Sequence, residues 1–136
     1  MILSIPVIAQ NFSTTDTITE YHIKATRYAD MYEGRRTASG EIFRQNLYTA
    51  AHWKIKMGTL VMVYNPESQK QLIVKINDRC PKHSLIDLTK RAAQELEISG
   101  CKPVKVRILP PSYKEQWEQQ KGPIKLSEKS IEINEK

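Results

Sequence analysis

The chain has 136 residues, enough for one compact domain with tails, because a domain typically takes about 100–150 residues. Hydrophobic residues make up 40% and charged residues 26%, a balance that excludes a fibrous or wholly disordered protein. No apolar run approaches the roughly 20 residues of a spanning helix, so an integral membrane protein is excluded. The net charge of +6 favours a polyanionic partner, which nucleic acid, anionic lipid and bacterial wall polymers all satisfy.

The first nine residues resemble the end of a secretory signal peptide. An apolar stretch runs from Ile2 to Ile8 and is followed by Ala9, a small residue of the kind after which signal peptidase cuts. We therefore expect an exported chain in which residues 1–9 are a truncated signal and residues 10–20 are a linker. The alternative is a buried N-terminal strand, which a proline in the stretch disfavours.

Apolar spacing predicts short strands through the middle of the chain. Residues 21–28 and 104–108 alternate with period two, whereas 60–64 is a continuous run, typical of a strand covered on both faces. Residues 71–76 follow a turn-forming cluster at 65–68, so they are expected to form a hairpin with 60–64. Many short strands predict a small β-barrel with an inserted helix.

One helix is predicted before the last strand. Thr89 can cap it, residues 90–98 are good helix formers, and Gly100 can end it. Two prolines then stop the last strand, and residues 110–136 are expected to form a charged C-terminal tail that is flexible or helical. The Lys and Glu residues of this tail cancel, so the net positive charge lies on the rest of the chain.

Polar stretches interrupt the strands and hold the candidate catalytic groups. Asp78 comes directly off an apolar strand, and Asp87 lies just before the predicted helix. Burial beside apolar residues is expected to raise the pKa of such a carboxyl group towards that of a useful general acid. His52, among alanines, and Glu41, in a Ser-Gly-Glu turn, are the other candidates. From spacing alone each has a structural alternative as a capping, core or solvated loop residue.

Two other classes of site are disfavoured. His52 with Asp78 and Cys80 or His83 matches no standard zinc spacing, so no metal or other cofactor is expected, and a cysteine nucleophile is equally weak. The Arg-Arg pair at 35–36 beside tyrosines offers charge and stacking for nucleic acid, but the sequence contains no recognised nucleic-acid motif.

Six sequence elements, in one order, resemble the rare lipoprotein A family, septal-ring lytic transglycosylases built on a double-psi β-barrel. These elements are the aromatic opening strand at Tyr28, Gly-Arg-Arg-Thr-Ala-Ser-Gly-Glu at 34–41, Leu-Tyr-Thr-Ala-Ala-His at 47–52, Gly-Thr at 58–59, Ile-Asn-Asp-Arg at 76–79, and Ile-Asp-Leu-Thr at 86–89 with the following helix. The resemblance covers residues 21–109 and implies a mainly β fold, a six-stranded double-psi β-barrel with one or two short helices. Expansins are more distantly similar.

The resemblance implies cleavage of the β-1,4 bond between N-acetylmuramic acid and N-acetylglucosamine in peptidoglycan, with release of a 1,6-anhydro end. The attacking group is the sugar's own 6-hydroxyl, whose effective molarity can reach about 10⁵ M, so one acid suffices where most glycosidases use two carboxylates. Asp78 is expected to be this acid/base and His52 to hold or polarise it. Glu41 would join the same cluster, and Asp87 would give electrostatic support or be the acid itself.

The expected surroundings of this site follow from the same resemblance. The residues expected to bind substrate are Tyr28, Tyr32, Arg36, Ser39, Trp53 and Arg79. The aromatic members are expected to act as sugar platforms, with a place in the core as the alternative. Glycan strands are the expected partner, together with cell-division or wall-synthesis proteins and without nucleic acid. A monomer in the periplasm or cell envelope is expected.

Two positions depart from the family pattern. Family members often carry an acidic residue three positions after the Glu of Ser-Gly-Glu, where this chain has Arg44. This change keeps open an alternative, an expansin-like barrel that binds or loosens glycan without cutting it. The common Asn-Asp-Arg-Gly-Pro is here Asn-Asp-Arg-Cys-Pro. In an exported chain Cys80 and Cys101 are expected to form a disulfide, with two buried thiols as the alternative.

Overall fold

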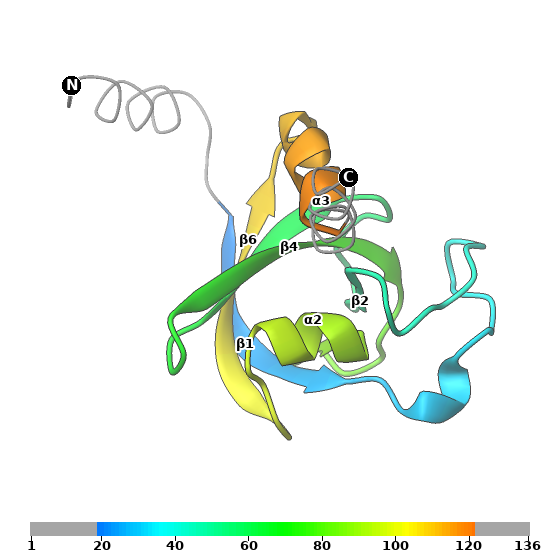
Figure 1. Cartoon of the computed structure of the whole chain (residues 1–136), viewed down its shortest axis with the longest axis horizontal. Coiled ribbons are helices and arrows are strands. Elements are labelled where there is room, and N and C mark those ends of the chain that lie inside the picture. Colours follow the sequence, from blue (N-terminus) through cyan, green and yellow to red (C-terminus); the bar gives the residue numbers. More distant parts are fainter. Residues whose placement is uncertain (1–18, 122–136) are drawn as a thin grey trace, which may run out of the picture.

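The computed structural model describes residues 19–121, so the expected signal remnant at 1–9 and the end of the predicted tail lie outside the described residues (Figure 1). Six strands form a closed barrel in the order β1-β5-β2-β4-β3-β6, which confirms the predicted fold class. The strands are β1 (Glu20–Arg27), β2 (Thr49–Ala51), β3 (Leu60–Asn65), β4 (Lys70–Asp78), β5 (Leu85–Leu88) and β6 (Lys102–Leu109). The helices are α2 (Lys90–Glu95) and α3 (Lys114–Lys121), with 3-10 turns η1 (Asp30–Tyr32) and η2 (Pro111–Tyr113). Within this range no helix combines the length and apolar character that a membrane span requires.

The barrel combines the predicted hairpin with two parallel pairings. β3 and β4 pair antiparallel from Leu60↔Lys75 to Asn65↔Lys70, as the sequence predicted. β1 pairs parallel with β5, and β2 pairs parallel with β4. The sequence did not predict β2 and β5 as strands, because three or four residues are too few for a periodic signal. These two short strands lie side by side in the barrel and carry residues of the candidate site.

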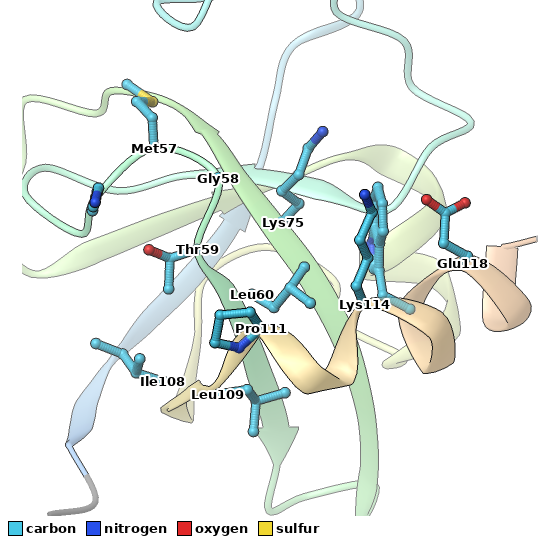
Figure 2. Close-up of a pocket in the computed structure, with 12 residues that line it drawn as sticks. Met57, Gly58, Thr59, Leu60, Lys75, Ile108, Leu109, Pro111, Lys114 and Glu118 are labelled. Carbon is cyan, nitrogen blue, oxygen red and sulfur yellow. The ribbon is translucent and has the colours of Figure 1, made fainter.

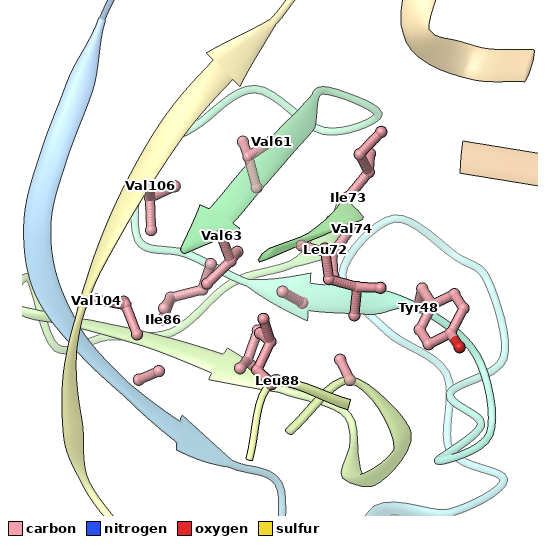
Figure 3. Close-up of a cluster of buried hydrophobic side chains, with 14 of the residues drawn as sticks. Tyr48, Val61, Val63, Leu72, Ile73, Val74, Ile86, Leu88, Val104 and Val106 are labelled. Carbon is pink, nitrogen blue, oxygen red and sulfur yellow. The ribbon is translucent and has the colours of Figure 1, made fainter. Parts of the chain in front are cut away.

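The core fills the inside of the barrel. In β6, Val104 and Val106 are buried while Lys105 and Arg107 are exposed, which is the two-residue alternation expected of a strand with one face inward. Figure 3 shows the inward side chains gathered between the strands, among them Val61, Val63, Leu72, Val74, Ile86, Leu88, Val104 and Val106. Complete burial of each such side chain contributes about 1.5–3 kcal/mol, so this cluster fixes the strand register.

Helix α2 begins where the sequence predicted and ends earlier. Thr89 is its N-cap, and its hydroxyl accepts a hydrogen bond of 3.2 Å from the Ala92 amide. The helix is capped at Leu96, because Glu97 adopts the left-handed conformation with φ of 58°. The prediction that Gly100 ends the helix is therefore wrong, since the reversal comes three residues sooner without a glycine.

Helix α3 packs on the outside of β4, so residues 110–121 are part of the folded unit. Trp117 is 5% exposed, and its indole Nε1 donates to the Tyr48 carbonyl at 2.9 Å. The Gln120 side-chain oxygen accepts from the Ile73 backbone amide at 3.0 Å, and the Gln120 side-chain nitrogen donates to the Ile73 carbonyl. Because β2 pairs only with residues 75–78 of β4, Gln120 occupies a part of β4 that this short strand leaves without a neighbour.

Candidate active site

Two carboxylates flank the short strand β2. Ala51 pairs with Asp78 of β4 on one side and with Asp87 of β5 on the other. The register between β2 and β4 shifts between Ala50 and Ala51, which brings Asp78 opposite Ala51. Two strand spacings, roughly 10 Å, separate the strands that carry Asp78 and Asp87, and the charges of both carboxylates act on Tyr28. Ala51 packs in a small cluster with Tyr28 and Phe43, separate from the main core. The barrel therefore brings both predicted acids to one face.

Three donors hold the Asp78 carboxylate. The Tyr28 hydroxyl donates to Oδ2 at 2.7 Å, and the amides of Ala38 and Arg79 donate to Oδ1 at 2.8 and 2.9 Å. The carboxylate is half-buried, and three groups fix its orientation. They are the Tyr28 side chain just after β1, the Ala38 backbone amide in a loop, and the backbone amide of the next residue, Arg79. Such an arrangement suits a group that exchanges a proton with a substrate at a defined position.

Tyr28 is a partner of this carboxylate, and its ring is buried, which is the core position that the sequence analysis gave as the alternative to a sugar platform. It is only 8% exposed, and its ring packs against Phe43 with centroids 4.2 Å apart. Burial, followed by the hydrogen bond and charge of Asp78 and the charge of Asp87, raises the pKa of Tyr28. The phenol therefore stays protonated and serves as a donor to Asp78.

Replacing Tyr28 by Phe is expected to lower the rate of the glycan cleavage that the sequence resemblance implies roughly 10- to 100-fold, because a hydrogen bond to a charged group is lost. The ring packing survives, so the free energy of unfolding is expected to change by no more than about 1–2 kcal/mol. Cleavage assays and urea unfolding measure the two effects. Tyr64→Phe, in the wall strand β3, is the control, and equal rates for both variants would rule out the role of Tyr28.

Asp87 is held from the neighbouring strand β1. Thr26 is its direct partner in the parallel pairing, and the Thr26 hydroxyl donates to Asp87 Oδ1. The Cys80 thiol lies close to Asp87, and burial together with the Asp87 charge raises the pKa of Cys80. This cysteine therefore stays a neutral thiol beside the carboxylate, and Thr26 is a site residue that the strand pattern alone did not indicate.

The two cysteines are free thiols in the structure, so the predicted disulfide is absent. Cys80 is buried in the small cluster with Tyr28, Phe43 and Ala51, and its Sγ faces the Lys82 carbonyl at 3.8 Å. Cys101 is exposed immediately before β6. The expectation depended on an even cysteine count, which says nothing about where the two sulfur atoms point.

His52 lies beside Asp78 through the backbone, but its ring does not hold the carboxylate as predicted. The His52 amide donates to the Asp78 carbonyl at 3.2 Å. The ring is completely buried, and its Nδ1 accepts hydrogen bonds from the amides of Lys54 and Ile55, each at 3.2 Å. Among the described residues Nε2 has no hydrogen-bond partner. The imidazole therefore caps its own loop.

The loop after β2 in turn binds the Arg79 side chain. Arg79 Nη1 donates to the carbonyls of His52 and Ile55 at 3.1 and 2.7 Å. This guanidinium, expected to bind substrate, is therefore engaged with the loop, while its backbone amide contacts Asp78. Burial, then the charges of Arg79 and Lys54, lowers the pKa of His52 to about 4, so the ring is neutral at pH 7.

The free energy of unfolding is expected to fall as the pH is lowered from 6.5 to about 4. Unfolded histidine takes up a proton near pH 6.5, whereas folded His52 does so only near pH 4. Between pH 6.5 and about 4 the unfolded state binds more protons than the folded state. Up to about 3 kcal/mol of the stability present above pH 6.5 is therefore lost when the pH reaches about 4. Urea unfolding across the window measures this loss. His52→Asn, whose amide oxygen can accept from the same backbone groups, should flatten the profile, and equal slopes would contradict a buried neutral ring.

The Thr-Ala-Ser-Gly-Glu stretch forms a small hairpin that docks on the end of β4. A bridge between Arg36 and Ile42 closes it, and Gly40 supplies the turn with φ of 94°. The Ser39 amide donates to the Asn77 carbonyl at 3.2 Å, next to the contact that the hairpin makes with Asp78. Arg36, a predicted substrate ligand, donates to the Gly40 carbonyl at 2.7 Å and braces the turn. Ser39 is exposed at the tip.

Glu41 ends this hairpin and is bound by two residues of β4. Its Oε1 accepts from the Asn77 amide at 2.9 Å, and its Oε2 pairs with Lys75 Nζ at 2.7 Å. Asn77 directly precedes Asp78, so the Glu41 and Asp78 carboxylates both lie at the same end of β4. Lys75 and Asn77, the partners of Glu41, were not among the predicted site residues. Asn77 was visible within the Asn-Asp-Arg motif, whereas nothing near Lys75 in the sequence pointed to this role.

Arg44 takes part in a surface ion pair. Its guanidinium lies 3.4 Å from the Glu33 carboxylate, with about half of each side chain exposed. The other Glu33 oxygen accepts from the Gln45 amide at 2.8 Å. In this chain the position that is often acidic therefore joins the turn after η1 to the segment before β2.

Of the predicted aromatic platforms, Tyr32 and Trp53 retain accessible surface. Tyr32 is 41% exposed, touches Tyr28 edge to face at 5.8 Å, and has the Arg35 guanidinium over its ring. Trp53 is half-buried and stacks on His83 with centroids 3.9 Å apart. Within residues 19–121, no three His, Cys, Asp or Glu side chains gather as a metal ion would require.

Residues 24–108 match the model of a double-psi β-barrel family described as lytic transglycolase, which is more than half of the chain. The chain belongs to this family. Among its curated relatives is the endolytic peptidoglycan transglycosylase RlpA of Pasteurella multocida, 43% identical over 86 residues, or 62% of this chain and 29% of that protein. The probable endolytic peptidoglycan transglycosylase RlpA of Treponema pallidum is 44% identical over 86 residues, 62% of this chain and 27% of that protein. The chain thus matches less than a third of the length of either relative.

Solved structures agree with the family's barrel fold. An expansin of Clavibacter michiganensis, without ligand, superposes with a TM-score of 0.55 at 19% identity, covering 68% of this chain and 51% of that one. The Streptomyces papain inhibitor superposes with a TM-score of 0.54 at 19% identity, covering 68% of this chain and 96% of that one. At these identities the likeness establishes the barrel and carries no information about activity.

Proposed function

We propose that this family barrel is a lytic transglycosylase that cleaves the β-1,4 bond between N-acetylmuramic acid and N-acetylglucosamine in peptidoglycan glycan strands. The observation that carries the proposal is the pair Asp78 and Asp87 on one face of β4-β2-β5, each held by a side-chain hydroxyl. Family membership and the activity named for the relatives support it. The site of action is then the bacterial cell envelope, where peptidoglycan lies.

In the proposed reaction Asp78 first acts as an acid. Its carboxyl proton moves to the glycosidic oxygen as the bond from that oxygen to C1 of the muramic acid breaks, which frees the N-acetylglucosamine end. The resulting Asp78 carboxylate is stabilised by donors already in place, the Tyr28 hydroxyl and the amides of Ala38 and Arg79.

The same carboxylate then acts as a base. It takes the proton of the sugar's 6-hydroxyl as the oxygen at C6 bonds to C1, which yields the 1,6-anhydro end and restores protonated Asp78. No water is consumed. Because the attacking oxygen and the reacting carbon belong to the same sugar residue, the step gains the effective molarity of an intramolecular reaction, up to about 10⁵ M in favourable systems.

The remaining site residues have supporting roles in this proposal. Asp87 supplies negative charge near the anomeric carbon, where positive charge develops as the bond to the leaving oxygen breaks. Glu41 fixes the hairpin whose Ala38 amide contacts Asp78. The exposed Tyr32 ring, beside Tyr28, offers a stacking face to a sugar.

Mass spectrometry of purified glycan strands after incubation with the protein tests the proposal. Anhydro-muramyl ends are the expected products. Ends that have gained water would identify a hydrolase instead. Retention of uncut polymer would favour the alternative, an expansin-like module that binds glycan without cutting it.

A further inference from the structure

We propose that Lys75, backed by Trp117 of α3, is a positioning residue for the Glu41 carboxylate. The inference rests on the proposed function, in which Glu41 fixes the hairpin whose Ala38 amide contacts Asp78. The family match ends at residue 108, so α3 lies beyond the residues that the family model describes.

Lys75 makes a short, charge-assisted contact with Glu41. Its Nζ lies 2.7 Å from Oε2, and the Lys75 side chain is only 23% exposed. Asn77 donates to the other Glu41 oxygen, so each oxygen of the carboxylate is bound by a donor from β4, and the two donors are two residues apart on that strand. Losing the Lys75 contact would remove the charged donor from Oε2 and leave the Asn77 bond at Oε1 in place.

The Lys75 stem borders open space, so packing alone does not fix its amine. A pocket of about 660 Å³ lies between the 57–59 turn, the end of β6 and α3, and Lys75 is part of its wall. Figure 2 shows Lys75 rising from β4 between Gly58 on one side and Lys114 of α3 on the other. A four-carbon stem beside such a space has several rotamers open to it, so a further contact is needed to keep the amine on Glu41.

Trp117 restricts the Lys75 amine to one place. Lys75 Nζ lies 5.1 Å from the centre of the Trp117 ring, within the range of a cation–π contact. The indole is itself fixed, because its Nε1 donates to the Tyr48 carbonyl, the same oxygen that accepts the Lys75 amide at 3.1 Å. The ring and the lysine it supports are therefore tied to a single backbone group.

Lys75→Met, which keeps the length of the stem and removes its charge, is the first test. It is expected to lower kcat for glycan cleavage roughly 10- to 100-fold with KM little changed, since a shift of the hairpin that holds Asp78 misplaces the acid/base and costs about this much. Lys75→Arg should recover most of kcat. Lys114→Met, which removes a charge from the same pocket wall, is the matched control and should retain kcat.

Two further comparisons separate positioning from a general loss of structure. In a chain that already carries Glu41→Gln, Lys75→Met should cause no additional loss of kcat, because the lysine acts through that carboxylate. Trp117→Phe, which keeps a ring face for the amine, should retain more kcat than Trp117→Leu at matched thermal stability. Additive losses for the Lys75 and Glu41 variants, or equal kcat for the two Trp117 variants, would overturn the inference.

The wild-type chain distinguishes this inference from the proposed function. If it releases anhydro-muramyl ends and Lys75→Met retains full kcat, the positioning role fails and the proposed function stands. If it cleaves no glycan, the proposed function fails and the positioning role fails with it.

Discussion

Asp78→Asn is expected to reduce the rate of anhydro-muramyl release by about 10²–10⁴-fold, the usual contribution of a general acid/base. The amide cannot donate and regain a proton as a carboxyl group does. Its side-chain oxygen can still accept from the Ala38 and Arg79 amides, so the hairpin stays docked and the fold is retained. Quantitative mass spectrometry of the products gives the rate, and far-UV circular dichroism checks the fold.

Two other aspartates make this result specific. Asp30→Asn removes an exposed carboxylate that pairs with Arg27 on the surface and should leave the rate unchanged. Asp87→Asn compares the two acids directly. An unaffected rate in Asp78→Asn together with a lost rate in Asp87→Asn would transfer the acid/base role to Asp87.

Trp117→Ala is expected to lower the free energy of unfolding by about 3–5 kcal/mol, the usual cost of truncating a buried large aromatic side chain. The change removes the indole from the outside of β4 and leaves the Tyr48 carbonyl without one donor. Domains are stabilised by only about 5–15 kcal/mol in total, so the effect would be a large fraction of stability. Urea unfolding followed by far-UV circular dichroism measures it.

A graded series on α3 distinguishes packing from helix propensity. Trp117→Phe should cost about 1–2 kcal/mol, because it keeps most of the ring and loses the hydrogen bond. Gln116→Ala, at an exposed position of the same helix, should cost close to nothing. If Trp117→Ala costs no more than Gln116→Ala, helix α3 does not unfold together with the barrel.

The elements with a clear local pattern could be predicted from the sequence. The alternation at 104–108 and the continuous run at 60–64 indicated strands, because a side chain on a strand faces the core at every second position or on both faces. The turn cluster at 65–68 indicated the hairpin, and Thr89 indicated the start of α2. Each of these signals lies within a few neighbouring residues, and residue type and spacing over that range determine strands, turns and helix caps directly.

The partners of the candidate site could not be predicted in the same way. Asp78 and Asp87 were identified because each adjoins an apolar segment, but their meeting across Ala51 depends on two short strands without a periodic signal. The path of its own loop sets the direction of the His52 ring. The presence of a histidine next to the site therefore did not reveal that its Nδ1 binds the amides of Lys54 and Ile55. Tyr28 was likewise identified, with a place in the core as the alternative, but its hydrogen bond to Asp78 was not predicted.

Residue type and local spacing were enough to predict the strands with alternating side chains and the candidate acids, and the resemblance of six motifs indicated the barrel family. The contacts of Tyr28 with Asp78, of Lys75 with Glu41 and of Trp117 with Lys75 became known from the folded structure alone. These pairs are 34 to 50 residues apart where they involve an acid. Closure of the barrel brings the two residues of each pair together. A contact between residues so far apart in the chain leaves no local pattern in the sequence.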